Sequence, residues 1–423
     1  MTIVLTLAAM FALLLMRVPV AFALGGLGLA MLILGGFSPL MAPQAILSTL
    51  DGFILLAVPL FLLMSNILLR AGVGNDLFAA VSAWVGHWPG GLAVATILSC
   101  GVFAAISGSS VATAATIGTV AIPEMINRGY NKRFVYGLLA AGGTLGILIP
   151  PSIPMIIYGF VTEESVISLF LAGIGPGIAL LVFFIIFSMI YARMGGQELE
   201  PKKDWAERKR ATIRALPSVV LAVLIISGIY SGAFTPTEAA AIGFAAALII
   251  TGPIMRVLTW DALKKAVFDS MATTVAIILI IAGAKVFGKA ITLYRIPQDI
   301  SVMITQGVDT ELGFILIVTA VLLVMGLVFE ALSMVLIMTP VLLPAALALG
   351  FDPIWFGVYM VIMVECALIT PPVGLNLYVI QSVAKARLGE VARGVAPFLL
   401  LMFACAAVLY VWHDLALYIP FKL

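Results

Sequence analysis

Apolar runs long enough to cross a lipid bilayer follow one another along almost the whole chain, and they limit what it can fold into. Hydrophobic residues make up 63% of the 423 residues and charged residues only 10%, whereas a soluble domain carries about 25% charged residues. A spanning helix needs roughly 20 apolar residues, so the chain has room for many of them. The sequence therefore predicts an all-α polytopic protein embedded in the lipid bilayer.

Glycine, proline and charged residues divide the chain into segments. The one long polar stretch, residues 193–214, lies near the middle and is expected to link two halves. Short amphipathic pieces are expected to lie along the membrane surface, at 42–50, 76–88, 259–268 and 297–308.

The two halves repeat the same order of segments. Their matching residues share an offset of 221 positions, pairing Pro123 with Pro344, Gly129 with Gly350, Pro150 with Pro371 and Pro151 with Pro372. We therefore predict two repeats, each with a helical hairpin followed by a helix broken at Pro-Pro. The repeats span 1–192 and 215–423. The hairpins span 92–127 and 312–348, and the broken helices span 133–162 and 355–384.

The distribution of basic residues predicts the orientation. With the N-terminus outside, 18 of the 22 Lys and Arg residues face the cytoplasm, as the positive-inside rule requires. Both termini are then periplasmic, and the 193–214 linker is cytoplasmic. This count holds when each hairpin enters and leaves on one side, the first opening to the cytoplasm and the second to the outside. The hairpins are therefore predicted to be re-entrant and the repeats to be inverted.

Inverted repeats with helices broken at corresponding positions are typical of a transporter site. In the first hairpin, the consecutive small residues 107–110 interrupt an apolar segment, and Gly108 allows the backbone to reverse. Their hydroxyl and carbonyl oxygens suit a hard cation, and the free N–H groups that begin the next helix suit a carboxylate. The alternative is that these small residues only let helices pack closely.

The segment predicted to face this hairpin contains Gly142, Gly143 and Gly146 ahead of Pro150 and Pro151. Such a sequence cannot continue a regular helix, so we expect the unwound centre of a broken span here. The alternative is a proline kink that binds nothing.

Charged residues inside apolar runs are functional by default. Glu330, at the predicted second tip, could bind sodium, carry a proton or cap the helix that starts near Ser333. Glu365 could contact an ion or substrate, or pack against a polar partner. Lys285 and Lys289 could reach the outer membrane surface, attract an anionic substrate or pair with a partner subunit.

Enzyme motifs are missing from the sequence. No Ser-His-Asp grouping, no Walker lysine and no HExxH occurs, so we expect no enzyme, no cofactor and an ion gradient as the energy source. The net charge of +2 does not indicate nucleic-acid binding, and the two histidines and three cysteines form no metal-binding pattern.

Five stretches, taken in order, resemble one known family. They are Arg17-Val18-Pro19, 56–61, 105–110, 146–152 and 368–376. Together they resemble the large membrane subunit of the TRAP transporters, the tripartite ATP-independent periplasmic importers, and the resemblance covers essentially the whole chain.

The resemblance implies a sodium-coupled importer of organic acids, chiefly carboxylates, in the bacterial inner membrane. A periplasmic substrate-binding protein would deliver the substrate, and a small four-helix membrane subunit would complete the complex. The fold would resemble that of the dicarboxylate/sodium symporters, with a scaffold and a moving elevator domain.

The resemblance also implies three sets of site residues. The first sodium ion would lie among Ser107, Gly108, Ser109, Ser110, Gly143, Thr144 and Gly146. The second would lie among Gly326, Glu330, Ser333, Thr370, Gly374 and Asn376. The substrate would contact Ser109, Ser110, Pro150, Ser152, Ser333, Pro371 and Asn376. A stand-alone dicarboxylate/sodium symporter without a binding protein is the alternative, and a passive channel fits less well because the polar residues cluster at four breaks.

Overall fold

The computed structural model describes residues 2–196, 201–307 and 310–422, and all regular structure in these ranges is helical. The first half contains α1 (Thr2–Leu15), α2 (Val20–Leu34), α3 (Met41–Leu50), η1 (Phe53–Leu56), α4 (Ala57–Arg70), α5 (Val73–Val85), α6 (Gly91–Ser107), α7 (Ser110–Asn127), α8 (Lys132–Leu148), α9 (Ile153–Thr162) and α10 (Val166–Met194). The second half contains α11 (Trp205–Tyr230), α12 (Pro236–Ile249), η2 (Ile250–Ile254), α13 (Trp260–Leu293), α14 (Ile296–Gly307), α15 (Glu311–Met325), α16 (Ala331–Ala348), α17 (Pro353–Leu368), α18 (Leu375–Ala384), α19 (Leu388–Val411) and α20 (Asp414–Lys422).

Many of these helices are suited to a bilayer. Seven in the described ranges are long and apolar enough to cross it, and the bent pair α8–α9 brings the number to eight. Large apolar side chains such as Leu34, Ile186 and Val223 are exposed on the outer surface, where lipid would cover them. The prediction of an all-α membrane protein is therefore confirmed.

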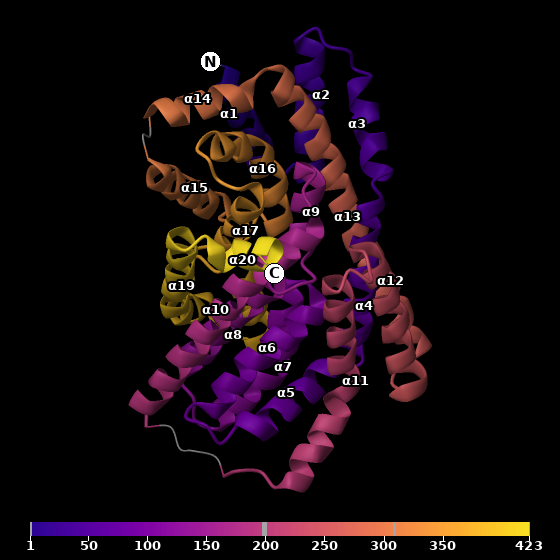
Figure 1. Cartoon of the computed structure of the whole chain (residues 1–423), viewed down its shortest axis with the longest axis vertical. Helices are drawn as coiled ribbons and strands as arrows, with labels where there is room; N and C mark the ends of the chain where they lie inside the picture. Colours follow the sequence, from indigo (N-terminus) through magenta and orange to yellow (C-terminus); the bar gives the residue numbers. More distant parts are fainter. Residues whose placement is uncertain (1, 197–200, 308–309, 423) are drawn as a thin grey trace.

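Helix α13 is the longest in the described chain and packs against α2, α3 and α4 (Figure 1). Glycines permit close approach to α2, since a Cβ on Gly283 would lie 2.3 Å from the Ala21 carbonyl oxygen. The prediction of a separate surface piece at 259–268 is wrong. Residues 269–270 are Asp and Ser, with neither glycine nor proline to end the helix, so α13 continues through them.

Both predicted hairpins form. In the first, α6 and α7 run antiparallel, because Thr96 near the start of α6 contacts Met125 near the end of α7, with 3.4 Å between Oγ1 and Sδ. In the second, Phe314 at the start of α15 lies beside Phe351, just beyond the end of α16, with ring centroids 5.9 Å apart. The tips therefore lie at 108–109 and 326–330.

The two Pro-Pro sequences break helices as expected. Helices α8 and α9 meet at a bend of 41° across 149–152, and α17 and α18 are separated by 369–374. The predicted unwinding at Gly142, Gly143 and Gly146 is wrong, because all three lie within α8. Their lack of a side chain allows close helix packing instead of breaking the helix.

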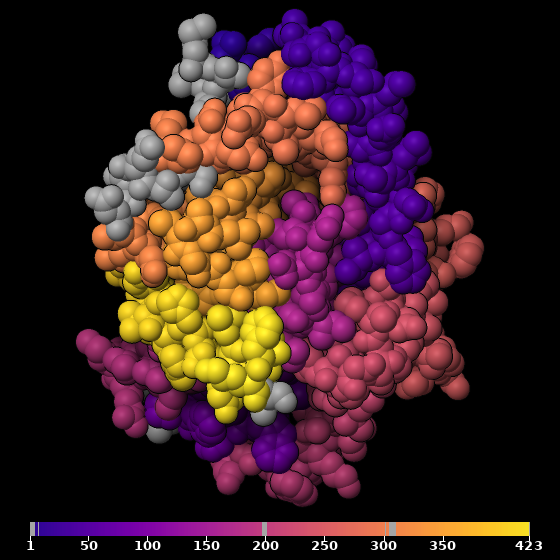
Figure 2. Space-filling model, turned by 45° about the horizontal axis from the view of Figure 1, so that its top comes forward, coloured from indigo at the N-terminus to yellow at the C-terminus, as the bar shows by residue number. Residues whose placement is uncertain are grey.

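The halves of the chain interleave. Helix α9 of the first half packs against α16 and α17, and α18 packs against α7 and α8. The hydroxyl of Tyr158 on α9 donates a hydrogen bond to the Pro353 carbonyl oxygen at 2.7 Å. Figure 2 shows α9, in magenta, between the orange second-half helices and the indigo N-terminal helices. The repeats are therefore divisions of the sequence that share one packed interior.

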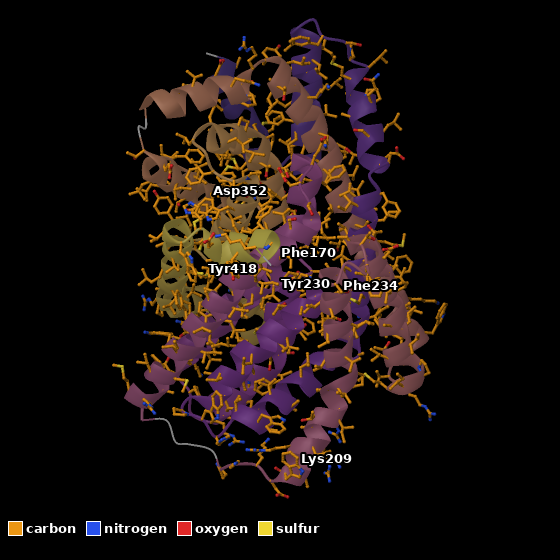
Figure 3. All side chains as sticks on the ribbon, in the orientation of Figure 1. Phe170, Lys209, Tyr230, Phe234, Asp352 and Tyr418 are labelled. Atoms are coloured by element: carbon orange, nitrogen blue, oxygen red, sulfur yellow. The ribbon has the colours of Figure 1, made fainter. Side chains whose placement is uncertain are left out.

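The predicted linker, 193–214, is partly helical. Its last ten residues form the start of α11, whose N-cap is Asp204, with the carboxylate accepting from the Trp205 N–H at 2.7 Å. Arg208 lies over the Trp84 ring of α5, 5.3 Å from its centroid, so this basic stretch is anchored to the first half. Figure 3 shows Lys209 at one extreme of the molecule, at the opposite end from α14 and the N-terminus.

Candidate substrate and ion site

A cavity of about 470 Å³ lies where the two hairpin tips approach each other. The first tip contributes residues 108–112, and the second contributes 330–332. Helices α4 and α13 close the other side through Asn66, Thr273 and their neighbours. We call this space the tip cavity. It brings together four of the predicted site residues, Gly108, Ser109, Ser110 and Glu330.

The first tip sits directly on the first helix break. Gly108 has a φ of +59°, which favours glycine, and a Cβ there would lie 2.5 Å from the Pro151 carbonyl oxygen. A Cβ on Gly146 would lie 2.6 Å from the Ser109 carbonyl oxygen, and one on Gly143 would lie 3.0 Å from that of Ser110. The residues of the predicted first sodium set, apart from the Thr144 side chain, thus lie on two backbone segments that contact each other.

Hydroxyl groups at this tip form a connected network. Ser107 Oγ and Thr113 Oγ1 are 2.8 Å apart, and Thr113 donates to the Ser109 carbonyl oxygen at 2.9 Å. Ser109 Oγ accepts from the Ala112 N–H at 3.3 Å and so caps α7. The tip therefore presents oxygen atoms and a helix N-terminus at the same place, which suits a hard cation beside an anion.

Thr144 points elsewhere. Its hydroxyl donates to the Ala141 carbonyl oxygen at 2.6 Å and lies 3.9 Å from Met402 Sδ on α19. The structure therefore does not bring this side chain to the tip. The family resemblance implies that Thr144 joins Gly143 in the first sodium set, but on a continuous helix Gly143 and Thr144 face different directions.

The first break also holds the predicted substrate residues Pro150 and Ser152, and both are buried. Ser152 Oγ accepts from the Met155 N–H at 3.4 Å, which caps α9. Neither residue lines the tip cavity, although Ile153 and Pro154, the next two along the chain, do.

Glu330 is the N-cap residue of α16 and makes no capping hydrogen bond through its side chain. It lines the tip cavity and its carboxylate lies close to Ser333, so its position is compatible both with a role toward the cavity and with a structural cap. Ser333 is fully buried, and its Oγ has no hydrogen-bonding partner among the described residues. Gly326, the first residue of the second tip, packs against α17, where an added Cβ would meet Ala367 Cβ.

The second break differs from the first in being open. Pro371 and its two successors are exposed, whereas the first break is buried. Thr370 donates to the Cys366 carbonyl oxygen at 2.6 Å, and Gly374 has a φ of +54° at the start of α18. None of these three predicted residues lines the tip cavity.

Asn376 was predicted to join the second sodium set, but the structure places it against the first tip. Its Nδ2 donates to Ser110 Oγ and to the Ala140 carbonyl oxygen, the latter at 3.4 Å. Glu365, on α17, lies next to Ser110 as well. Asn376 Oδ1 and both Glu365 carboxylate oxygens are buried without a hydrogen bond to any described residue. Residues from three helices thus form a polar cluster behind the first tip.

Three polar residues of the tip cavity were not predicted: Ser65, Asn66 and Thr273. Asn66 is held in place on α4 because its Nδ2 donates to Ser270 Oγ on α13 at 2.9 Å. An amide within the apolar run 53–70 was a usable signal, since polar residues inside a membrane segment are costly and face the interior.

Comparison with known proteins identifies a matching family. A family model described as the DctM component of the tripartite ATP-independent periplasmic transporters matches residues 7–415. The chain is 40% identical to the C4-dicarboxylate TRAP transporter large permease protein DctM of Pseudomonas aeruginosa over 354 residues, or 84% of this chain and 83% of that protein. It is 34% identical to the sialic acid TRAP transporter large permease protein SiaM of Vibrio cholerae, over 95% of this chain and 94% of that protein.

Among solved structures, the YdaH transporter of Alcanivorax borkumensis is similar in fold. The TM-score is 0.58 at 15% identity, over 87% of each chain. At this identity the likeness concerns the fold alone.

Proposed function

The chain belongs to the DctM component family of tripartite ATP-independent periplasmic transporters, and we propose that it carries a small organic acid across the inner membrane together with sodium. Family membership makes it a membrane transport component and not an enzyme. The proposal concerns the coupling ion, the position of the sites and the partners.

The charge of the tip cavity is the observation that carries the proposal. Glu330 is the one charged residue among the described residues that line it. A carboxylate substrate entering this cavity would meet a second negative charge, and like charges repel. A cation bound beside Glu330 removes that repulsion. Substrate binding is thereby made dependent on the cation, which is the requirement for coupled transport.

Segments rich in oxygen atoms flank the cavity. We propose one sodium ion between the first tip, 107–110, and the backbone of α8 at 143–146. A second would lie between the second tip, 326–330, and the helix break at 369–374. The substrate carboxylate would lie at the N-terminus of α7, where free N–H groups and the helix dipole favour negative charge.

The partners and the motion follow from the family. A periplasmic binding protein would deliver the acid, and a small four-helix membrane subunit would complete the complex. The tips, α8–α9 and α17–α18 would move as one body against α2, α3, α4, α12 and α13. Because relatives named for a C4-dicarboxylate and for sialic acid are similarly identical to this chain, the substrate is assigned here as a class, the small organic acids.

Reconstitution in proteoliposomes tests this function. The chain and its small partner subunit would be assayed with an inward sodium gradient, with and without the cognate binding protein, using labelled succinate and sialic acid. We expect uptake when sodium and the binding protein are both present, and none when choline replaces sodium. Uptake without the binding protein would identify a stand-alone symporter. Uptake that follows substrate alone, with no sodium dependence, would identify a channel.

A further inference from the structure

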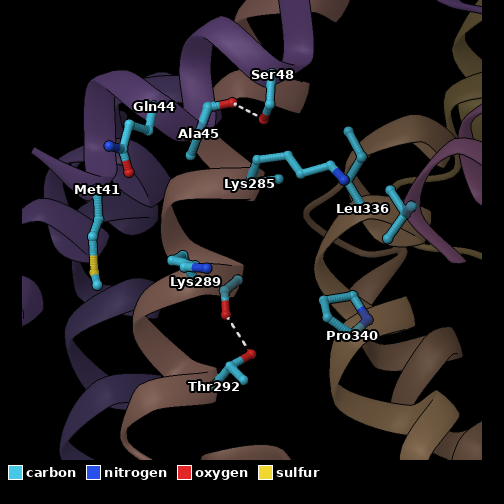
Figure 4. A pocket seen from close by; sticks show the side chains of 12 residues that line it. Met41, Gln44, Ala45, Ser48, Lys285, Lys289, Thr292, Leu336 and Pro340 are labelled. Carbon is cyan, nitrogen blue, oxygen red and sulfur yellow. Dashed lines mark hydrogen bonds between the residues drawn. The ribbon is translucent and has the colours of Figure 1, made fainter. Parts of the chain in front are cut away.

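A second cavity, of about 550 Å³, lies along the same helix as the tip cavity. Its walls come from α3, α9, α13 and α16, and its charged lining residues are Lys285 and Lys289 of α13. We call it the lysine cavity. Figure 4 shows Lys285 reaching across toward Leu336 of α16, with Lys289 one turn further along α13.

The two ammonium groups have no acidic partner at bonding distance. Neither lysine forms an ion pair with any acidic residue in the described part of the chain. Lys285 Nζ lies 4.6 Å from the centroid of the Phe160 ring, and the acidic group that acts on it is Glu163, at the end of α9. Glu163 does not line the cavity. The cavity is thus positively charged, the opposite sign to the tip cavity.

Neutral polar groups complete the wall. Gln44 of α3 offers an amide, and Ser48 and Thr292 offer hydroxyl oxygens whose hydrogens already bind the carbonyl oxygens of Ala45 and Gly288, at 2.9 and 2.8 Å. Two cations with an amide donor recognise a carboxylate.

The two cavities share one face of α13. Thr273 and Ile277 line the tip cavity, and Ala284, Gly288 and Thr292 line the lysine cavity. These spacings of four and seven residues place all five on one side of the helix. Ile281, fully buried, lies between them. At 1.5 Å per residue, Ile277 and Lys285 are separated by about 12 Å along the helix.

We propose that the lysine cavity is a receiving site for the carboxylate of the substrate, from which the anion passes along α13 into the tip cavity. This inference rests on the proposed function. The lysine cavity faces the predicted periplasmic side, since Arg70 and Asp269, beyond the other end of the tip cavity, form an ion pair on the predicted cytoplasmic side. Leu336 and Pro340 lie on α16, the helix that continues from the second tip, so one wall of the lysine cavity is joined directly to the proposed moving body.

Transport kinetics give the first test. Replacing both lysines with glutamine should raise the half-saturating substrate concentration about tenfold with the maximal rate unchanged, because a positively charged cleft concentrates an anion by that order. Arginine at both positions should restore the half-saturating concentration of the unaltered protein. Lys264→Gln, on the same helix, is the matched control. An unchanged half-saturating concentration in the double glutamine variant overturns the proposal.

Cysteine labelling tests the site even if no transport is measured. In lipid nanodiscs, Lys289→Cys would be reacted with methanethiosulfonates that carry either a sulfonate or a trimethylammonium group. The native cysteines, Cys100, Cys366 and Cys405, are buried. Lys264→Cys is the control, because its neighbour Lys265 is neutralised by Asp261 at 2.9 Å. The measured quantity is the ratio of the labelling rates of the sulfonate and trimethylammonium reagents. We expect this ratio to be about fivefold higher at position 289 than at position 264, and the difference to vanish with Lys285→Gln. Equal preference at both positions overturns the proposal.

Two further arms distinguish the source of the anion. Succinate should slow labelling at Lys289→Cys in phosphatidylcholine nanodiscs, whereas neutral succinamide should not. If phosphatidylglycerol slows the reaction and succinate has no effect, the occupant is a lipid headgroup and the substrate assignment is overturned. A chain that fails in uptake but passes the labelling tests would count against the proposed function and not against the anion site.

Discussion

Asn376 joins α18 to two helices of the first half of the chain, α7 and α8. Its side chain is fully buried, and Nδ2 bonds to Ser110 of α7 and to the Ala140 carbonyl oxygen of α8. Removing the amide leaves Ser110 without this partner, and an unsatisfied buried polar group costs about 1–3 kcal/mol. Asn376→Ala should therefore lower the thermal unfolding temperature of the detergent-solubilised protein. Asn75→Ala, at an exposed position of α5, is the control and should leave it unchanged. Equal unfolding temperatures for the two variants would contradict this role.

Glu330 sets the cation requirement in our proposal. Glu330→Gln keeps the size of the side chain but removes the negative charge that attracts the cation, so sodium should bind more weakly. We expect the sodium concentration for half-maximal uptake to rise about tenfold, equivalent to about 1.4 kcal/mol of lost sodium binding, with a shallower sodium dependence. The measurement is uptake against sodium concentration.

Glu311→Gln serves as the control for Glu330, because Glu311 begins α15 and is exposed. A sodium dependence of Glu330→Gln that matches that of Glu311→Gln would assign Glu330 a structural role.

At the residue scale, the sequence predicted what local chemistry determines. The run 107–110 was correctly placed at a tip because small polar residues and Gly108 favour a reversal there. The partner of Asn376 was not predictable, because it depends on how α18 packs against the other half of the chain. Asn66 was missed for a simpler reason, since it carries no charge and neither glycine nor proline marks a break beside it.

At the element scale, the contact between α8 and the first tip depends on glycine. A Cβ on Gly146 would lie 2.6 Å from the Ser109 carbonyl oxygen and 2.7 Å from Thr113 Oγ1, and both atoms belong to a bonded network with little freedom to move. Gly146→Ala should cost about 1–3 kcal/mol by overpacking and lower uptake at least tenfold by displacing the tip. Unfolding temperature and uptake are the two measurements.

Gly26→Ala is the matched control for Gly146→Ala, because an added Cβ on Gly26 of α2 meets nothing within 4 Å. Alanine is the better helix former by about 1 kcal/mol, so this control should be neutral or stabilised. Loss of uptake in both variants would show that the effect is general to glycine replacement and not specific to the tip.

The same glycines explain why one element was mispredicted. Proline lacks an N–H group and clashes with the preceding turn. Single prolines such as Pro176 still lie inside helices here, whereas the pairs Pro150–Pro151 and Pro371–Pro372 break theirs. Glycine only weakens a helix, by about 1 kcal/mol. In α8 that cost is offset by the close approach of the first hairpin, which the sequence of α8 alone does not reveal.

At the scale of the whole molecule, the repeat was visible in the sequence but the interleaving of its halves was not. A common offset of 221 positions reports equivalent elements, whereas the packing of α9 on α16 and of α18 on α7 is a property of the assembled chain. The orientation of the two hairpins relative to the membrane stays a prediction, and it has a direct test.

The open ends of the hairpins should face opposite sides of the membrane. Lys132 follows the first hairpin and Glu311 begins the second, and both are exposed. A membrane-impermeant maleimide should label Glu311→Cys in intact spheroplasts but label Lys132→Cys only after permeabilisation, with Lys203→Cys in the linker as the cytoplasmic control. The positive-inside rule requires this result, because the reverse orientation would place 18 of 22 basic residues outside. Labelling of both hairpin ends from the same side would mean that the repeats are not inverted. The two tips would then enter the bilayer from one face, and a single motion could not expose their shared cavity to each side in turn.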